Sequence, residues 1–411
     1  MKISFTLFQV FALCGGSTHA FLATNNNHRL IVSTSTSTLH SSTETSDASA
    51  STAKSGVESI GLLTFDLDDT LYPIDQIVND ANAAFVQAME RFGFDGVDAL
   101  DIVNTGKKVR KELSETDPEK AAGLTHTEVR EMAIRREMEQ IILARKLQQC
   151  ADDWATPVES LSPIVRKPAE QWAKGAVSGS VVQQVLTSWE MERHHSAERH
   201  IFPGVIDALK KIKEEHPDVI IGAVTDGKAN PQLMTFTLAP YFDFCMSWED
   251  EQGNRQQFFR ELNDVEMTPE LTWIYDAARH KYAMLKEAQV GINAAKNPST
   301  GGESEIAPLV FPDCYDDLAW VHVGDDLAFD VGGSAACGAK TVLVELPKSL
   351  GQTAPFRFDT SIQQPHWATT TKTELEGRIR MNEAARELVT VEINTLERLP
   401  IAINQMLRGD L

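Results

Sequence analysis

The sequence has little cysteine and no cysteine-pair motif. Its 411 residues include five cysteines, and no two of them stand in a C-x-x-C pattern. This absence excludes a zinc ribbon and a thioredoxin-like redox motif. A chain of this length can bury a large core without cross-links, so we interpret the cysteines as reduced thiols. The sequence also contains neither a P-loop nor a G-x-G-x-x-G pattern.

Positive charge is scarce as well. Lysine and arginine number 38 against 59 aspartate and glutamate residues, which gives a net charge of -21. A chain this acidic repels nucleic-acid phosphates and anionic lipid, so we expect no nucleic-acid partner and no membrane partner for the mature form. A small phosphorylated metabolite remains compatible with this charge, because a binding site needs only a local positive field. The oligomeric state does not follow from the sequence.

The first apolar run of the chain is too short to span a membrane, for which roughly 20 residues are needed. Lys2 precedes this run and small residues follow it up to Ala20, which predicts a signal peptide over residues 1–20. Residues 21–56 are rich in serine and threonine, and they contain no acidic residue before position 44. They are predicted to be a transit peptide or a disordered linker. Together the two segments resemble the bipartite presequence of proteins imported into the secondary plastids of algae; the alternative is a secreted or endomembrane protein.

A short apolar run at residues 61–65 leads directly into Asp66 and Asp68. Carboxylates at the end of a buried strand are costly unless a cation lies beside them. Two aspartates two residues apart share one face of a strand. At the carboxyl end of a strand in an open α/β sheet they could converge on one ion, and Mg²⁺ suits oxygen ligands of this kind. Taken alone, the segment is equally typical of an acidic turn or a helix cap.

Two later apolar runs end in the same way. Residues 219–224 are followed by Thr225, Asp226 and a glycine, whose hydroxyl and backbone N–H groups could hold a phosphoryl oxygen. Residues 318–323 are followed by Gly324 and by three further carboxylates, namely Asp325, Asp326 and Asp330. A fourth run occupies residues 341–344. Strands separated by helical segments predict an α/β fold with a Rossmann-like parallel sheet.

These three segments, DLDDTLYP, VTDG and VGDDLAFD, resemble in their order the motifs of the haloacid dehalogenase-like (HAD) hydrolase superfamily. The resemblance covers about residues 60–75 and 200–400. It implies that Asp66 is the nucleophile that attacks phosphorus and also binds the metal. It implies that Asp68 is the general acid and then the base, with its backbone carbonyl on the metal. Dehalogenases of the superfamily lack an acid at this second position, so Asp68 favours phosphoryl chemistry.

The resemblance also gives roles to the later motifs. Thr225 and Asp226 would bind the substrate phosphoryl group. Asp325 and Asp326 would bind Mg²⁺. Asp330 would lie beside these metal ligands and hold them in position. The metal cancels the repulsion between an attacking carboxylate and a phosphate dianion.

The phosphate-binding cation is the least defined part of the pattern. Relatives carry a Lys-Pro segment after a stretch similar to residues 247–253, and no Lys-Pro follows here. Lys281 is the nearest lysine beyond the next helical segment, Arg255 is an alternative, and a third alternative is that the cation is missing. An arginine is not an equivalent replacement, because its guanidinium is wider and flatter.

Residues 74–200 are predicted to form an all-helical cap inserted into the core, which comprises residues 57–73 and 201–411. Apolar residues follow helical spacing from Ile74 to Met89, from Thr127 to Gln149 and from Gln171 to Met191. Thr125 or Thr127 could cap the second of these helices. The cap resembles the C1 type of subfamily I phosphatases, which closes over the substrate.

The motifs, together with the family that they resemble, imply a Mg²⁺-dependent phosphatase that hydrolyses a small phosphomonoester through an aspartyl-phosphate intermediate. Two alternatives stay open at this point. One is a phosphotransferase or phosphomutase of the same fold, and the other is a non-catalytic HAD-like binding protein.

Overall fold

The computed structural model describes residues 60–249, 272–296, 319–353 and 372–411. The chain divides into two compact units, Met1–Ser55 and Gly56–Leu411, and every described residue belongs to the second. The predicted signal and transit peptides and Arg255 lie outside the described residues. None of the helices in the described ranges combines the length and the hydropathy of a membrane span.

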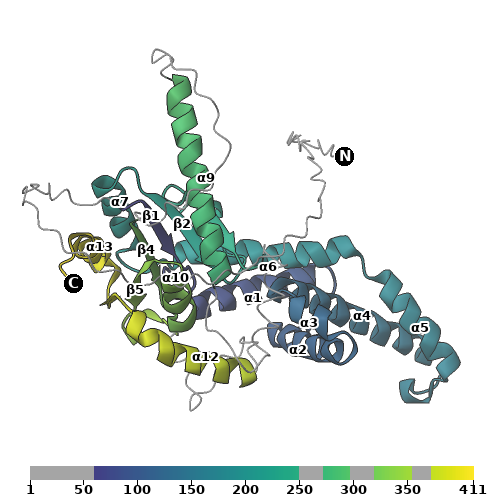
Figure 1. Cartoon of the computed structure of the whole chain (residues 1–411). Coiled ribbons are helices and arrows are strands. Elements are labelled where there is room, and N and C mark those ends of the chain that lie inside the picture. The colour runs from purple at the N-terminus through teal and green to yellow at the C-terminus, as the bar shows by residue number, and fades with distance from the viewer. Residues whose placement is uncertain (1–59, 250–271, 297–318, 354–371) are drawn as a thin grey trace, which may run out of the picture. The chain divides into compact units, whose positions relative to one another are not determined.

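A parallel sheet of six strands, in the order β3-β2-β1-β4-β5-β6, organises the described residues (Figure 1). Leu62 of β1 is in register with Ile220 of β2 on one side and with Trp320 of β4 on the other. All five strand pairs are parallel, which confirms the predicted Rossmann-like α/β fold. The strands are β1 (Leu62–Phe65), β2 (Ile220–Thr225), β3 (Phe244–Ser247), β4 (Trp320–Gly324), β5 (Lys340–Val344) and β6 (Val391–Ile393).

The strand order reverses between β1 and β4. The chain proceeds from β1 through β2 to β3 on one side, and continues with β4, β5 and β6 on the other. Ligands of open α/β sheets bind outside the carboxyl ends of the strands at such a switch point. The residues that follow β1 and β4, Asp66 and Asp325, therefore lie where this topology places a binding site.

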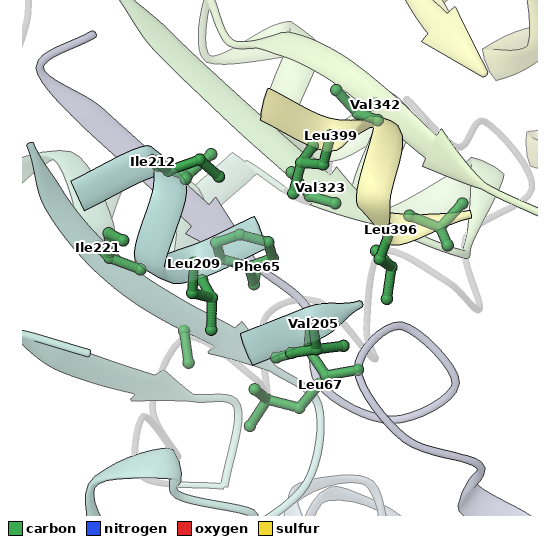
Figure 2. Close-up of a cluster of buried hydrophobic side chains, with 14 of the residues drawn as sticks. Phe65, Leu67, Val205, Leu209, Ile212, Ile221, Val323, Val342, Leu396 and Leu399 are labelled. Atoms are coloured by element: carbon green, nitrogen blue, oxygen red, sulfur yellow. The ribbon is translucent and has the colours of Figure 1, made fainter. Parts of the chain in front are cut away.

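Helices cover both faces of the sheet because the strands are buried on both sides. Leu63 and Phe65 of β1 belong to a cluster with α7 (Val205–Glu215) and α13 (Leu399–Arg408), which Figure 2 shows in part. Leu62 points to the opposite face, where α9 (Thr272–Lys296) and α12 (Lys372–Ala385) contribute to a second cluster. The result is a three-layer α/β/α core.

The chain between β1 and α7 contains helices and their connections, which we call the helical insertion. It has its own hydrophobic cluster, formed mainly by α1, α4 and α6. Thr125 caps α4 and forms a capping box with Glu128. Of the two threonines predicted as alternative caps of this helix, Thr125 is therefore the one that is confirmed. The domain limits at residues 73/74 and 200/201 stay predictions. The insertion comprises α1 (Ile74–Arg91), α2 (Ala99–Thr116), α3 (Pro118–Gly123), α4 (His126–Asp153), α5 (Pro163–Ala176) and α6 (Gly179–Arg199).

The single helix predicted from Gln171 to Met191 is wrong, because α5 ends at Ala176 and α6 begins at Gly179. Val177 and Ser178 between them have extended backbones. Glycine at positions 175 and 179 weakens helical continuity on either side of the break.

The central position of β1 gives a first testable expectation. Leu63 is fully buried between the sheet and its helices, so Leu63→Ala removes packed methyl groups and leaves a cavity. We expect a loss of about 2–5 kcal/mol in the free energy of unfolding, measured by urea denaturation. Leu100→Ala is the matched control, since Leu100 is 43% exposed on α2. Equal stability of the two variants would contradict the core position of β1.

Candidate active site

Three carboxylates meet at the carboxyl ends of β1 and β4. Asp66, Asp325 and Asp330 each offer one oxygen, and these oxygens lie within 4.8 Å of one another. We call these residues the carboxylate cluster. The backbone N–H of Asp66 donates to the carbonyl of Val323 at 2.9 Å, so the chain stays aligned with β4 beyond the end of β1. Asp330 comes from the π-helical segment η3 (Leu327–Gly333), which follows β4.

Gly324 makes room for the third carboxylate. A Cβ at this position would lie 2.2 Å from Cγ of Asp330, a separation that no side chain tolerates. The glycine therefore lets the side chain of Asp330 pack directly against the end of β4. Asp330 is also held by the backbone N–H of Asp326, which donates to its Oδ2 at 2.9 Å.

A buried threonine joins two members of the cluster. The Thr70 hydroxyl is 3.0 Å from Oδ1 of Asp325 and 3.4 Å from Oδ2 of Asp66. A hydroxyl has one hydrogen to donate, and the shorter distance favours Asp325 as its acceptor. The sequence analysis did not single out Thr70, although it belongs to the DLDDT motif.

Asp69 fixes the loop that carries Asp68 and Thr70. Its φ of 62° lies in the left-handed region, which costs free energy for a residue other than glycine. The Asp69 carboxylate accepts from the Ile74 N–H at 3.0 Å, and from the N–H and hydroxyl of Thr353 at 2.9 and 2.6 Å. The amide of Gln352 donates to the Asp69 carbonyl at 2.9 Å. These bonds hold the strained backbone in place, so Asp69 is a structural acid.

The electrostatics of the carboxylate cluster call for a cation. Burial raises the pKa of Asp66 well above its ordinary value, and the negative charges of Asp330, Asp325, Asp226 and Asp68 raise it further. An ionised Asp66 is thus disfavoured unless positive charge is supplied. Hard oxygen ligands in this number fit Mg²⁺, which takes few protein carboxylates and completes its shell with water or phosphate. Asp66, Asp325 and Asp330 are the residues that would hold it.

Asp330 also contacts buried polar side chains on the face of the sheet that α9 covers. The Tyr275 hydroxyl of α9 donates to Oδ1 of Asp330 at 3.3 Å, and Nε2 of His322 lies 3.4 Å from the same oxygen. Burial raises the pKa of Tyr275 and nearby carboxylates raise it further, so this phenol keeps its proton and remains a donor. Nδ1 of His322 lies 2.8 Å from the Thr64 hydroxyl, which also accepts from the indole of Trp320 at 2.9 Å.

The structure places Asp326 outside the carboxylate cluster. Its Oδ1 accepts from the Phe329 N–H at 2.8 Å and caps η3, and its Oδ2 pairs with Arg378 of α12 at 2.6 Å. The guanidinium of Arg378 in turn lies 3.3 Å from the centre of the Phe329 ring. The metal-ligand role predicted for Asp326 stays a prediction, and the geometry brings Asp330 to the cluster instead.

The end of β2 carries the predicted phosphoryl-binding residues. Thr225 is buried, and its hydroxyl lies 3.5 Å from the N–H of Gly227. The hydroxyl of Ser247, at the end of β3, donates to the Gly227 carbonyl at 2.7 Å and fixes this turn. Asp226 is exposed. These contacts set the position of Thr225 beside the strand ends, and its substrate-binding role stays a prediction.

Arg193 of α6 is a further site residue that the sequence analysis did not single out. Its guanidinium donates to Oδ2 of Asp68 in an ion pair that is almost fully buried. Burial lowers the pKa of Arg193, but the negative charges of Asp68, Asp226 and Glu249 outweigh this and raise it, so the side chain stays charged. The two partners are 125 residues apart in the sequence, and no local pattern connects them.

In the described ranges, no contact joins Lys281 to the carboxylate cluster. Tyr275 on the same helix reaches Asp330, and Lys281 follows it by six residues, which is about 9 Å along α9 and on a different face. Arg255, the alternative cation, lies outside the described residues. The role of Lys281 in phosphate binding therefore stays a prediction.

No family model and no curated protein matches this sequence. Solved structures with which the chain aligns include a 2-haloacid dehalogenase from Pseudomonas syringae, at 18% identity over 84% of this chain and 99% of that one, with a TM-score of 0.43. A putative HAD-hydrolase from Bacillus subtilis, bound to magnesium, aligns at 13% identity over 84% and 100%, with a TM-score of 0.32. A putative beta-phosphoglucomutase from Thermotoga maritima aligns at 11% identity over 86% and 100%, also at 0.32. Similarities this low assign no activity to this chain.

The raised pKa of Asp66 predicts a pH-dependent stability. A carboxyl whose pKa is higher in the folded than in the unfolded chain stabilises the fold below its unfolded pKa, and this contribution is lost as the pH rises through the folded pKa. Without metal, we therefore expect Asp66→Asn to be more stable than the parent protein at about pH 8, by about 1 kcal/mol or more, and to converge with it near about pH 4. Denaturation in EDTA across this range measures the difference. If the parent protein were more stable than Asp66→Asn at high pH, the result would contradict the repulsion between Asp66 and its neighbouring carboxylates.

Gly324→Ala tests whether Asp330 belongs to a metal site. The added Cβ forces Asp330 away from the cluster, and we expect Mg²⁺ affinity, measured by titration calorimetry, to fall about tenfold or more. Gly377→Ala in α12 is the matched control, since a Cβ there meets nothing within 4 Å. If Gly324→Ala bound Mg²⁺ with unchanged affinity, Asp330 would not belong to the metal site.

Proposed function

We propose that this chain is a HAD-like hydrolase that uses Mg²⁺ to cleave a small phosphomonoester through an aspartyl-phosphate intermediate. The observation that carries the proposal is the carboxylate cluster at the switch point of a parallel sheet, where three carboxylate oxygens lie within 4.8 Å of one another. Such a cluster is costly by itself, and it suits a divalent cation that also receives a phosphoryl oxygen.

In this proposal Asp66 attacks phosphorus and forms a bond from its carboxylate oxygen. The bond between phosphorus and the alcohol oxygen breaks, and Asp68, which enters this step in its protonated form, donates that proton to the leaving oxygen and becomes a carboxylate. Asp68 then takes a proton from water, which attacks the phosphorus and releases Asp66 and inorganic phosphate. When bound, Mg²⁺ supplies positive charge that offsets the repulsion between Asp66 and the phosphoryl group.

The remaining side chains position these groups. Thr70 orients Asp325 through its hydroxyl, which also lies 3.4 Å from Asp66. Asp69 holds the loop that carries Asp68. Thr225 offers its hydroxyl to a phosphoryl oxygen. The helical insertion reaches Asp68 through Arg193, so it borders the site on the side of the general acid.

Asp68 favours phosphoryl transfer over dehalogenation, because release of an alcohol needs a proton donor and release of a halide does not. A phosphomutase of the same fold would need to retain and rebind a phosphorylated intermediate, and no observation in the described residues points to this.

The test is release of inorganic phosphate from an aryl phosphate and from a panel of small phosphomonoesters by the leaderless protein. We expect turnover with Mg²⁺ that EDTA abolishes, and a decrease of at least about 10³-fold in kcat for Asp66→Asn, since the covalent route is lost. Asp101→Asn, which alters an exposed helix-capping acid of α2, is the matched control. Turnover that persists in Asp66→Asn would refute the nucleophile, and metal-dependent binding without any turnover would favour the non-catalytic alternative.

A further inference from the structure

Arg193 has a donor that the described residues leave unused. The side chain is only 9% exposed, and one terminal nitrogen donates to Asp68. Its Nε is buried and has no hydrogen-bond partner in the described part of the chain. A buried N–H of a charged group without an acceptor destabilises the fold, so such a donor indicates an acceptor that arrives with a ligand.

The backbone of the β2 turn leaves room for the guanidinium. A Cβ on Gly227 would lie 3.0 Å from both terminal nitrogens of Arg193. The guanidinium therefore packs directly on the turn that follows Thr225. A flat group held between this turn and Asp68 is placed to form paired hydrogen bonds with a planar or tetrahedral anion.

A second arginine of the helical insertion lies on the same tryptophan. The guanidinium carbon of Arg130, on α4, is 3.6 Å from the centre of the Trp189 ring, and that of Arg193 is 5.8 Å from it. The indole N–H donates to Asn82 at 3.0 Å, which fixes the ring. Burial and the charge of Arg193 lower the pKa of Arg130 to about 10, so it stays protonated at neutral pH. Two cations of the helical insertion thus lie near one tryptophan ring, and one of them, Arg193, contacts Asp68.

Neighbouring contacts hold α6 against the core at this point. The Asn230 N–H donates to Nε2 of His194 at 3.2 Å, and Nδ1 of His194 donates to the Glu190 carbonyl at 2.8 Å. The Phe236 N–H donates to Glu198 at 2.8 Å. The contacts of His194 and Glu198 therefore hold this part of α6, and with it Arg193, against the core.

Asp68 marks the side of the leaving group, because in the proposed reaction it protonates the alcohol oxygen. A cation beside Asp68, supplied by the helical insertion, consequently faces the alcohol part of the substrate. We propose that Arg193 binds an anionic group on that alcohol part, so that the preferred substrates are phosphomonoesters with a second negative group, a carboxylate or a second phosphate. This inference rests on the proposed function and specifies its substrate class.

The experiment compares alkyl phosphates of two to four carbons that end in a methyl group, a carboxylate or a second phosphate. We expect kcat/KM of the parent protein to be at least about 30-fold higher for one or both of the charged series than for the methyl series, mainly through a lower KM. The carboxylate and phosphate series distinguish the two sources of negative charge. Arg193→Gln should reduce this selectivity ratio at least tenfold, and Arg193→Lys should retain more of it than Arg193→Gln.

Arg136→Gln is the matched control, because Arg136 pairs with Glu112 on the exposed surface of the insertion, and its selectivity ratio should equal that of the parent. A parent protein without preference for the charged series overturns the inference and leaves the proposed function standing. An equal loss for the methyl and charged series in Arg193→Gln also overturns it, since Arg193 would then act only on Asp68 or on the phosphoryl group. If no ester of any series is hydrolysed, the proposed function itself fails.

Discussion

Mutual repulsion among carboxylates at the ends of two adjacent strands is the constraint on which the site depends. Asp66 and Asp325 meet because β1 and β4 are neighbours, and Asp330 joins them because Gly324 leaves space for its side chain. Burial adds to the repulsion and raises the pKa of Asp66. The fold tolerates this arrangement through hydrogen bonds from Thr70, Tyr275 and the backbone of the loops. Such an arrangement is unfavourable alone and becomes favourable when a cation binds, as the proposed metal site requires.

The loop after β1 transmits this constraint to the helical insertion. Asp69, in a strained conformation, ties the loop to Thr353 and Gln352 of the core, while Asp68 on the same loop pairs with Arg193 of α6. Two consecutive residues of this loop, Asp68 and Asp69, therefore connect the insertion to Gln352 and Thr353 of the core. A substrate that contacts both Asp68 and Arg193 would therefore touch the loop after β1 and the helical insertion at once.

The sequence predicts most of the fold and part of the site. Apolar runs that end in acids identify β1, β2 and β4 and place Asp66 and Asp325 at their tips, because parallel strands bring their carboxyl ends to one edge. The choice between Asp326 and Asp330 depends on Arg378, which is 52 residues beyond Asp326 and on another helix. Arg193 depends on how α6 docks on the core. Contacts between residues far apart in the sequence leave no periodic or local signal. For this reason the sequence analysis did not identify Arg193 and did not place Asp330 beside Asp66 and Asp325.

The most direct test of the central claim is the number of Mn²⁺ ions bound per chain, counted by electron paramagnetic resonance as free Mn²⁺ is titrated. We expect one Mn²⁺ ion to bind per chain and Mg²⁺ to displace it. The number of bound ions should be unchanged in Asp326→Asn, whereas Asp325→Asn should bind Mn²⁺ at least about tenfold more weakly. The contrast between the two adjacent aspartates is specific to this geometry. No bound Mn²⁺, or equal losses in the two variants, would contradict the carboxylate cluster as a metal site.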